Sequence, residues 1–421
     1  MGQYDRKAKS QPKHGKPSDS GASKAPVRPT RGLPGWKGPS YIHKKKKPQP
    51  AAGSEASAAM EASLRLEHIL PIELEQLILN VFRATFPAAN DFEALKPTLQ
   101  EIKDALFQRD FDRAFGRDDF LEAYAIRWSP SRALGYAQLL AWICEERADD
   151  ACIKRLAGGA DEHKPAKVVC FGGGAAEIMA FSALLCHLQQ SRAAGRAELL
   201  SEDPSGDSEA ASSSPSLLDL QLLDTADWSS VLSKMHTGLT TAPVLSKYAS
   251  AAARAANAPF LSPGTLDHTF TRADVLECSI DSLRSIIGPE PALLTLLFTL
   301  NELYTASIPR TTAFLLKVTE AAPKGSMLLV VDSPGSYSET AVGDAKDPTQ
   351  KKKYPMSWLV DYVLVPPEKK KEDEDDGETK EGPRWEKVVD ESSMWYRLDE
   401  GLEYPVSLEN MRSQVHLFRR I

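Results

Sequence analysis

Apolar residues follow two different patterns, one on each side of residue 160. Between residues 64 and 146 they recur at helical spacing, as Leu74, Leu77 and Ile78 do. After residue 160 they gather in short continuous runs, which are typical of parallel strands covered on both faces. The clearest runs are 167–171, 217–224, 292–300 and 327–332. The pattern predicts a helical region followed by an α/β domain with a mostly parallel, Rossmann-like sheet.

The ends of the chain complete this outline. Residues 385–389 and 414–418 resemble a closing antiparallel pair of strands, so we expect an antiparallel C-terminal strand in the sheet. Residues 1–60 hold few large apolar groups and cannot bury enough surface to offset the entropy of ordering. The predicted organisation is a disordered basic tail (1–60), an N-terminal helical region (61–160) and an α/β domain (161–421) with disordered insertions near 193–216, 340–353 and 367–383.

A glycine turn organises the α/β domain. The apolar run ending at Phe171 is followed by Gly172, Gly173 and Gly174, and then by a helical pattern. Strand, glycine turn and helix together hold a nucleotide-like ligand at a helix N-terminus. Glu177 stands where a dinucleotide fingerprint has glycine, and its carboxylate would repel a pyrophosphate. The turn therefore favours a cationic sulfonium cofactor, S-adenosylmethionine (SAM), over a dinucleotide; the alternative is a turn that only packs strand on helix.

The next strand supplies a candidate for the ribose of such a cofactor. In nucleoside-binding α/β folds the second strand ends in an acid that accepts the ribose hydroxyls. Asp224 ends the run 217–224, whereas Asp219 lies within it and is the weaker choice. Trp228 is a candidate to cover the adenosine, with a buried structural tryptophan as the alternative.

Polar residues that follow later strands extend the predicted site, because ligands bind beyond the carboxyl ends of parallel strands. Asp274, with Val275 beside it, is expected to meet the adenine. Asn301 and Glu302 follow the run 292–300 and are expected near the sulfonium methyl.

A helix start before the domain contributes one further candidate. Ser129 is expected to cap this helix, with Pro130 at its first position. Arg132 then falls in the first turn, where the helix dipole gives a cation no benefit. It has either a carboxylate or phosphate partner elsewhere, or is a surface arginine.

Charge is distributed unevenly. The net charge is −7, but residues 1–50 hold 13 Lys or Arg against two Asp, so the remainder is strongly acidic. A basic arm on an acidic body suggests a polyanionic partner. Within the arm, residues 44–47 are four lysines, a cluster of the kind found in nuclear import and nucleic-acid contacts, or a solvated run that aids solubility.

Several functional classes are not indicated. The five cysteines lack paired metal spacing and are expected to be reduced thiols in an intracellular protein, with no metal site. No apolar segment follows the first methionine, and no run approaches the ~20 residues of a membrane span. We expect a monomer that does not contact membranes.

Taken with these motifs, the chain resembles the large-subunit (25S) ribosomal RNA uridine-N3 methyltransferases, which have the class I SAM-dependent fold. The resemblance covers about residues 74–421 without the insertions. It is carried by 127–134, 171–178, 299–304, 395–397 and 409–420. Two positions depart from the common class I pattern: Cys170 stands where an acid often precedes the glycines, and Ala176 replaces the third glycine.

The resemblance implies SAM as cofactor, ribosomal RNA or a pre-ribosomal particle as partner, and action in the nucleus or nucleolus, with the cytoplasm as a further location. It implies 3-methyluridine as product. Because N3 of uridine is a poor nucleophile until it loses its proton, Glu302 is the candidate base, with a capping or adenosine-contacting carboxylate as the alternative. Tyr304 and Arg132 are the candidates to stabilise charge on the uracil oxygens. Trp395 and Tyr396, with Arg397, offer stacking and phosphate contact, or belong to the core.

Two other functions remain open from the sequence. One is a class I methyltransferase of a protein or small molecule, against which the basic arm argues. The other is a non-catalytic ribosome-assembly factor with a methyltransferase fold, against which the intact glycines and Asp224 argue.

Overall fold

The computed structural model describes residues 64–65, 68–158, 164–202, 217–335, 337–341, 351–366 and 384–421. The predicted basic tail therefore lies outside the described residues, as do 203–216, 342–350 and 367–383 of the predicted insertions. The first part of the insertion predicted near 193–216 is helical, because α8 (Ala175–Glu202) continues through it.

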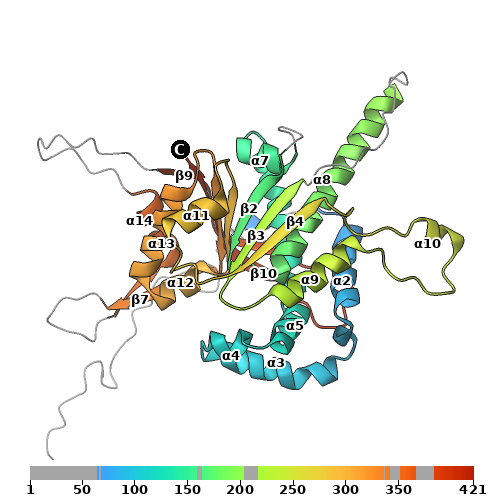
Figure 1. Cartoon of the computed structure of the whole chain (residues 1–421), viewed down its shortest axis with the longest axis horizontal. Helices are drawn as coiled ribbons and strands as arrows, with labels where there is room; N and C mark the ends of the chain where they lie inside the picture. Colours follow the sequence, from blue (N-terminus) through green and yellow to red (C-terminus); the bar gives the residue numbers. More distant parts are fainter. Residues whose placement is uncertain are drawn as a thin grey trace, which may run out of the picture. The chain divides into compact units, whose positions relative to one another are not determined.

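The described residues form an eight-stranded sheet in the order β1-β9-β10-β6-β5-β2-β3-β4 (Figure 1). The five strands from β6 to β4 are parallel, whereas β10 is antiparallel to both β6 and β9. The predicted Rossmann-like sheet with an antiparallel C-terminal strand is thus confirmed. The strands are β1 (Leu64–Arg65), β2 (Ala166–Phe171), β3 (Leu218–Asp224), β4 (Leu266–Arg272), β5 (Leu293–Leu297), β6 (Met327–Asp332), β9 (Trp385–Tyr396) and β10 (Met411–Arg420), with β7 (Tyr337–Ala341) and β8 (Lys351–Pro355) as a separate pair.

Helices cover both faces of the sheet (Figure 1). One face carries α6, α8 and α9, and the other carries α11, α13 and α14. The helices are α2 (Ile72–Thr85), η1 (Pro87–Asn90), α3 (Phe92–Phe107), α4 (Phe111–Phe115), α5 (Asp118–Arg127), α6 (Ser129–Glu146), α7 (Ala151–Leu156), α8, α9 (Ser229–Thr240), α10 (Ala251–Ala255), α11 (Ile280–Ile287), α12 (Leu300–Ala306), α13 (Ile308–Ala321) and α14 (Met356–Leu364).

Side chains of β2 alternate between two cores. Val168 and Cys170 pack under α6 and α8, whereas Val169 and Phe171 pack under α11 and α13. Successive side chains of a strand point to opposite faces, so a strand covered on both sides must be apolar at every position. This explains why the central strands are uninterrupted apolar runs in the sequence.

The N-terminal helices share the first of these cores with the sheet. Glu75 of α2 is fully buried and accepts hydrogen bonds from Gln138 Nε2 of α6 and Tyr396 Oη of β9, each at 2.8 Å. Tyr396 is therefore a core residue, as one reading of the sequence proposed. Residues 59–421 belong to one compact unit.

The start of α6 differs from the prediction. Ser129 is the first helical residue rather than the cap; Trp128 occupies the cap position, and its side chain makes no capping hydrogen bond. Instead, Ser131 Oγ accepts the backbone N–H of Glu409 at 3.0 Å. The Ser131 hydroxyl thus joins the start of α6 to the segment that precedes β10.

The predictions on cysteines, membrane spans and metal sites can be compared with the described residues. All five cysteines are free thiols; Cys144, Cys152 and Cys170 are buried, whereas Cys186 and Cys278 are only partly buried. Across the described part of the chain, no helix combines the length and the apolar character that crossing a membrane requires. No group of three or more His, Cys, Asp or Glu side chains within the described ranges has a geometry suited to a metal ion.

Candidate active site

The glycine turn joins β2 to α8 at the carboxyl edge of the parallel strands. Gly172 has φ +83°, and a Cβ there would come within 2.4 Å of Thr299 Oγ1. A Cβ on Gly173 would meet Cys170 Cβ at 2.6 Å, and one on Gly174 would meet the Trp228 ring at 3.2 Å. Close packing alone therefore requires glycine at Gly172 and Gly173, and the positive φ requires it again at Gly172.

Glu177 holds this turn from the first turn of α8. Its Oε2 accepts the Gly174 N–H at 2.7 Å, and its side chain is buried. Burial raises the pKa of Glu177 to about 7, although the backbone hydrogen bonds and the charge of Arg132 oppose the rise. Asp224 adds to the increase, so the two carboxylates lie close enough to repel each other.

Asp224 lies at the end of β3, next to the turn. Its Oδ1 accepts the Ala226 N–H at 2.8 Å. Burial raises the pKa of Asp224 to about 6 despite hydrogen bonds from the backbone and from the Trp228 side chain. Trp228 is buried against Gly174 and contacts Tyr124 with ring centroids 6.0 Å apart. It is thus a packed tryptophan that also borders the predicted ribose site.

These carboxylates fit a cationic nucleoside cofactor. Removing a carboxylate from water is unfavourable, and the pKa values of Glu177 and Asp224 stay raised in spite of the Arg132 charge and their hydrogen bonds. A ligand that carries a sulfonium charge and ribose hydroxyls would add both positive charge and further donors. A pyrophosphate would add negative charge to a site that already holds two acids.

Asp274 and Val275 follow β4 at the same edge of the sheet, since the Ala273 N–H donates to the Asp224 carbonyl at 2.8 Å. The Asp274 carboxylate accepts the Leu276 N–H and pairs with Arg310 Nη2 at 3.1 Å. Val275 is buried in the core. The structure places both residues near the end of β3, but Asp274 already has two partners.

Asn301 lies in the first turn of α12, just beyond β5. Its N–H donates to Asp332 Oδ2 at 3.0 Å, while its side-chain oxygen Oδ1 is buried and accepts no hydrogen bond from the part of the chain that the structure describes. A buried unsatisfied carbonyl is costly, so a donor from a bound ligand would be favourable here. Burial also raises the pKa of Asp332, and the nearby Glu302 carboxylate adds to the rise.

Glu302 follows Asn301 on α12 and is partly exposed. Its Oε2 accepts from Arg109 Nη1 at 2.6 Å. Arg109 lies in the turn between α3 and α4 with φ +56°. The predicted base is therefore held by an arginine from the N-terminal helices, a contact that spans 193 residues of sequence.

The role predicted for Tyr304 needs correction. Its side chain is 1% exposed and packs in the core beneath α13 and α14. Its hydroxyl is buried and has no hydrogen-bond partner within the described ranges, and burial raises its pKa further above the usual range. Helix α12 turns this side chain into the core rather than toward the surface.

Arg132 instead joins residues that the sequence did not single out. Its guanidinium lies over the Phe298 ring at 4.4 Å and donates to Tyr136 Oη at 3.3 Å. Its charge also lowers the pKa of Glu177. Arg132 therefore lies at the site rather than on an isolated surface.

Phe298 and Thr299 form the strained connection between β5 and α12. Phe298 has φ +56°, which is exceptional for a bulky residue and is concentrated at functional sites. Phe298 and Thr299 could have been predicted as site residues because they follow a strand. Tyr136 could have been predicted as a partner of Arg132 because it lies four residues further along the predicted helix. The positive φ of a phenylalanine leaves no trace in the sequence.

A hollow of about 180 Å³ opens beside Arg132 and Phe298. Its wall brings together two segments distant in the sequence, 127–132 and 409–412. Both segments carry the family resemblance. Trp395 lies next to Arg412, whose guanidinium is 5.4 Å from its ring, and Arg397 is 4.7 Å from the same ring. The segments that distinguish this chain from other glycine-motif proteins therefore meet at one cavity.

The sheet order, the antiparallel β10 and a nucleoside-type site at the carboxyl edge together define a class I methyltransferase. The family comparison agrees. The chain belongs to the family described as "Putative SAM-dependent methyltransferase", whose model matches residues 82–419. SAM, which the sequence predicted from Glu177, is the cofactor of this family.

Similar proteins were found by sequence and by structure. The 25S rRNA (uridine(2843)-N(3))-methyltransferase of Saccharomyces cerevisiae is 33% identical over 352 residues, covering 82% of this chain and 85% of its own. This relative confirms the resemblance drawn from the sequence. A SAM-dependent methyltransferase from Methanosarcina mazei is 9% identical, covers 62% of this chain and 94% of its own, and gives a TM-score of 0.29. An O-methyltransferase family protein from Burkholderia thailandensis is 11% identical, with 71% and 62% covered and a TM-score of 0.27.

Proposed function

We propose that the protein is a SAM-dependent methyltransferase that methylates N3 of a uridine in large-subunit ribosomal RNA. The observation that carries the proposal is the pair of neighbouring carboxylates at the glycine turn, the buried Glu177 and the half-buried Asp224, whose raised pKa values suit a cationic methyl donor. The choice of uridine N3 rests on the yeast relative, because 33% identity extends over most of both chains.

The reaction requires N3 to lose a proton and gain a methyl group. SAM, when bound, supplies an electrophilic methyl group whose bond to sulfur breaks as the N3–C bond forms. The N3 proton passes to a carboxylate oxygen of Glu302, which leaves N3 with the electron pair that attacks. Arg109 orients the Glu302 carboxylate through their ion pair. Glu177 and Asp224 hold the cofactor, with Asn301 Oδ1 available to a donor of the ligand.

Arg132 is proposed to stabilise the uracil oxygens while N3 carries negative charge. Its guanidinium is fixed by Tyr136 and by the Phe298 ring, so little reorganisation is needed when charge develops. The target base must be unpaired or flipped to reach the hollow, as for other enzymes that modify bases.

Ribosomal RNA as substrate also suggests where the protein acts. We propose a pre-ribosomal particle as its partner and the nucleus or nucleolus as its location. Localisation of the tagged full-length chain, compared with a chain in which residues 44–47 are changed to alanine, tests whether the lysine cluster contributes.

The deciding experiment measures methyl transfer directly. Purified full-length protein, SAM and ribosomal RNA from cells lacking the protein should yield 3-methyluridine, detected by mass spectrometry of the digested RNA. Calorimetric titration with SAM is run in parallel. A protein that binds SAM but forms no 3-methyluridine in free RNA or in purified pre-ribosomal particles would refute the proposed substrate.

A further inference from the structure

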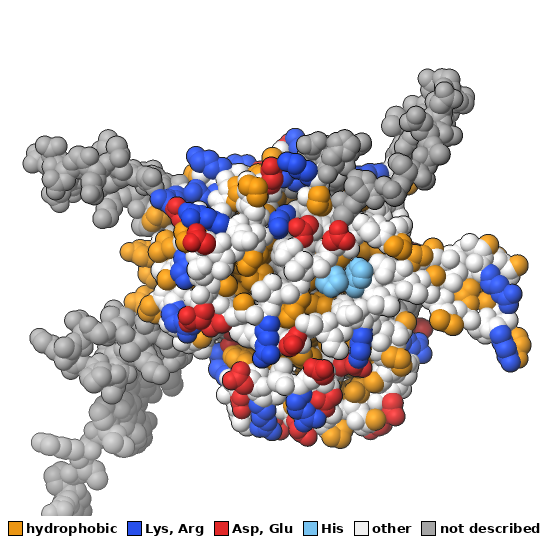
Figure 2. Space-filling view, viewed as in Figure 1, with side chains coloured by type: hydrophobic (Ala, Val, Ile, Leu, Met, Phe, Trp, Pro, Cys, Tyr) orange, Lys and Arg blue, Asp and Glu red, His pale blue; other side chains and the backbone are white. Residues whose placement is uncertain are grey.

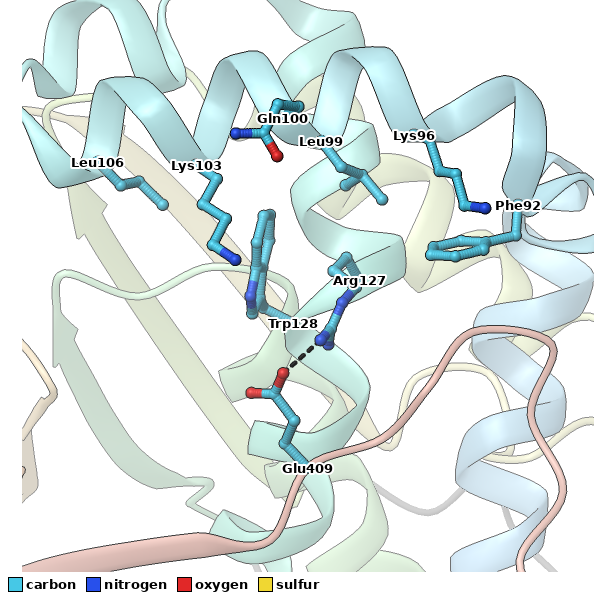
Figure 3. Close-up of a pocket in the computed structure, with 9 residues that line it drawn as sticks. All are labelled: Phe92, Lys96, Leu99, Gln100, Lys103, Leu106, Arg127, Trp128 and Glu409. Carbon is cyan, nitrogen blue, oxygen red and sulfur yellow. Dashed lines mark hydrogen bonds and ion pairs between the residues drawn. The ribbon is translucent and has the colours of Figure 1, made fainter. Parts of the chain in front are cut away.

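A larger hollow, of about 430 Å³, lies between α3 and the junction of α5 with α6 (Figure 3). We call it the α3 trough and define it by Phe92, Lys96, Lys103, Arg127 and Trp128. Its volume falls within the ~300–1,000 Å³ typical of ligand pockets. The cofactor site described above uses none of these five residues.

The charged groups of the trough are mainly cationic. Its wall contains Lys96, Lys103 and Arg127 but only one carboxylate, Glu409. On the face that Figure 2 shows, by contrast, Lys and Arg side chains are interspersed with Asp and Glu. Lys96 pairs with Glu93 at 2.5 Å, whereas no ion pair joins Lys103 to a described residue. The trough is therefore suited to an anion on a chain whose net charge is −7.

Arg127 retains unused hydrogen-bonding capacity. One terminal nitrogen, Nη2, pairs with Glu409, but the other, Nη1, is buried and has no hydrogen-bond partner among the described residues. Only 15% of the Arg127 side chain is exposed. Because a buried guanidinium donor without a partner is costly, this atom indicates a ligand that accepts hydrogen bonds.

Trp128 provides an aromatic surface in the same wall. Its ring packs against Tyr124, with centroids 5.0 Å apart, and stands between Lys103 and Arg127 (Figure 3). Indole rings stack on nucleobases regardless of sequence, and arginine binds phosphate oxygens in a bidentate manner. The combination of one aromatic ring with surrounding cations matches a nucleotide better than an acidic peptide, which offers no planar group to stack.

The trough shares part of its wall with the smaller hollow at Arg132 and Phe298. Arg127, Trp128 and Glu409 line both. A single strand whose target base enters the smaller hollow therefore has its neighbouring nucleotide beside the trough. The shared wall links the two positions.

We propose that the α3 trough binds a nucleotide next to the target uridine, stacking its base on Trp128 and holding a phosphate with Lys103 and Arg127. The inference rests on the proposed function, since it assigns part of the RNA substrate to a second site. It adds a contact to the single strand beside the target base, separate from the cofactor site.

Charge reversal at Lys103 tests the phosphate contact. The full-length Lys103→Glu variant should bind a fluorescent oligouridylate about tenfold more weakly than wild type at low salt, with SAM affinity unchanged. The slope of log affinity against log salt should fall by about 0.7 for one lost phosphate contact with a single strand. The matched control is Lys324→Glu, because Lys324 is exposed and precedes β6 at the opposite edge of the sheet. If both variants bind RNA as wild type does, the inference is wrong.

Conservative and aliphatic replacements of Trp128 test stacking. Trp128→Phe should retain RNA binding, whereas Trp128→Leu should lose about tenfold while still melting cooperatively and binding SAM. Equal RNA affinity for the two would overturn the stacking assignment. The formation of 3-methyluridine by wild type distinguishes failure of the trough inference from failure of the proposed function. If wild type methylates RNA and the trough variants match the Lys324→Glu control, only the trough inference fails. A wild-type protein that makes no 3-methyluridine refutes the proposed function itself.

Discussion

The glycine-turn edge and the α3 trough are opposite in charge and in exposure. At the turn edge, Glu177 is buried and Asp224 is half-buried, and the pKa values of both carboxyls are raised. In the trough, Lys96 and Lys103 are exposed. Burying an ionised carboxylate is unfavourable in free energy unless a cation binds beside it. An exposed lysine keeps its hydration and acts mainly through long-range attraction. The comparison suggests a small cationic ligand held tightly at one site and a polyanion attracted to the other.

The strongest test of the turn edge is Gly172→Ala. The substitution forces an alanine into a positive φ and brings its Cβ within 2.4 Å of Thr299 Oγ1. We expect the backbone strain alone to cost about 1–3 kcal/mol of stability and the displaced turn to abolish SAM binding. Thermal melting and calorimetric titration with SAM measure the two effects.

Gly264→Ala is the matched control for this substitution. Gly264 also has a positive φ, +82°, but nothing lies within 4 Å of its Cβ position. It should lose stability through backbone strain and retain SAM binding. If Gly172→Ala binds SAM normally, the turn is only a packing element, and one half of the comparison fails.

The next largest effect is expected at Glu302. Glu302→Gln removes the proposed base and should lower the methylation rate constant by ~10²–10⁴-fold, with SAM affinity unchanged. Glu290→Gln is the control, because Glu290 is also an exposed, ion-paired carboxylate and precedes β5 at the opposite edge of the sheet. Single-turnover kinetics with saturating SAM provide the measurement. A normal rate for Glu302→Gln would assign the proton transfer to another group.

Arg109 distinguishes a positioned base from a surface carboxylate. Arg109→Gln removes the side chain that pairs with Glu302 and holds its carboxylate in place. The single-turnover methylation rate constant should then fall by about tenfold, because a misplaced base reacts more slowly, while SAM affinity and the melting temperature stay close to those of wild type. A normal rate constant would contradict the proposed role of this ion pair.

A smaller effect concerns the pH dependence of cofactor binding. The pKa of Glu177 is about 7 and that of Asp224 about 6, so both carboxyls gain protons as the pH falls from 8 to 5.5. A cation binds the ionised forms of these carboxyls. The SAM dissociation constant should therefore rise as the pH falls, by up to tenfold per pH unit for each carboxyl that must lose a proton before SAM binds. Calorimetry across this range, with Asp224→Asn as comparison, should show a weaker dependence in the variant. A flat profile in wild type would mean that the carboxylates do not contact the cofactor charge.

The same carboxyls affect the unliganded protein in the opposite sense. Their pKa values are higher when folded than their ordinary values of 4.5 and 3.8, so the folded chain holds more protons than the unfolded chain between about pH 4 and 7. Their contribution to stability is present at the low end of this window and is lost as the pH rises. Melting curves without SAM measure this.

The smallest effect is expected for Tyr304→Phe. The hydroxyl is buried without a partner, so its removal should change stability by less than about 1 kcal/mol and leave methylation unchanged. Tyr136→Phe is the informative counterpart, because its hydroxyl accepts from Arg132. Tyr136→Phe should slow methylation modestly. If Tyr304→Phe lowers the methylation rate instead, the Tyr304 hydroxyl takes part in the reaction and is not merely a core group.

Local chemistry allowed much of the domain to be predicted from the sequence. Continuous apolar runs identified β2, β3, β5 and β6, since strands covered on both faces need apolar side chains at each position. Glycines followed by Glu177 predicted the turn and the sign of the ligand charge. These features depend on residues close together in the chain.

Tertiary structure decided which residues meet. No local pattern indicated that Arg109 would pair with Glu302 or that Glu75 would join α2, α6 and β9. Nor did any pattern indicate that residues 409–412 would line the same hollow as 127–132. Tyr304 was assigned to the site because it lies near a strand end, but the rotation of α12 buries it. Side-chain direction on a short helix depends on how that helix packs against the sheet.

The sequence by itself therefore determined the class of fold, the glycine turn and the acid at the end of β3, because each follows from local pattern and burial. Only the tertiary structure decided the contacts of Arg132 with Phe298 and of Arg127 with Glu409, and the existence of the α3 trough. These contacts join segments that are separated in the sequence, and their geometry is set by the packing of the N-terminal helices and the C-terminal strands around one shared core.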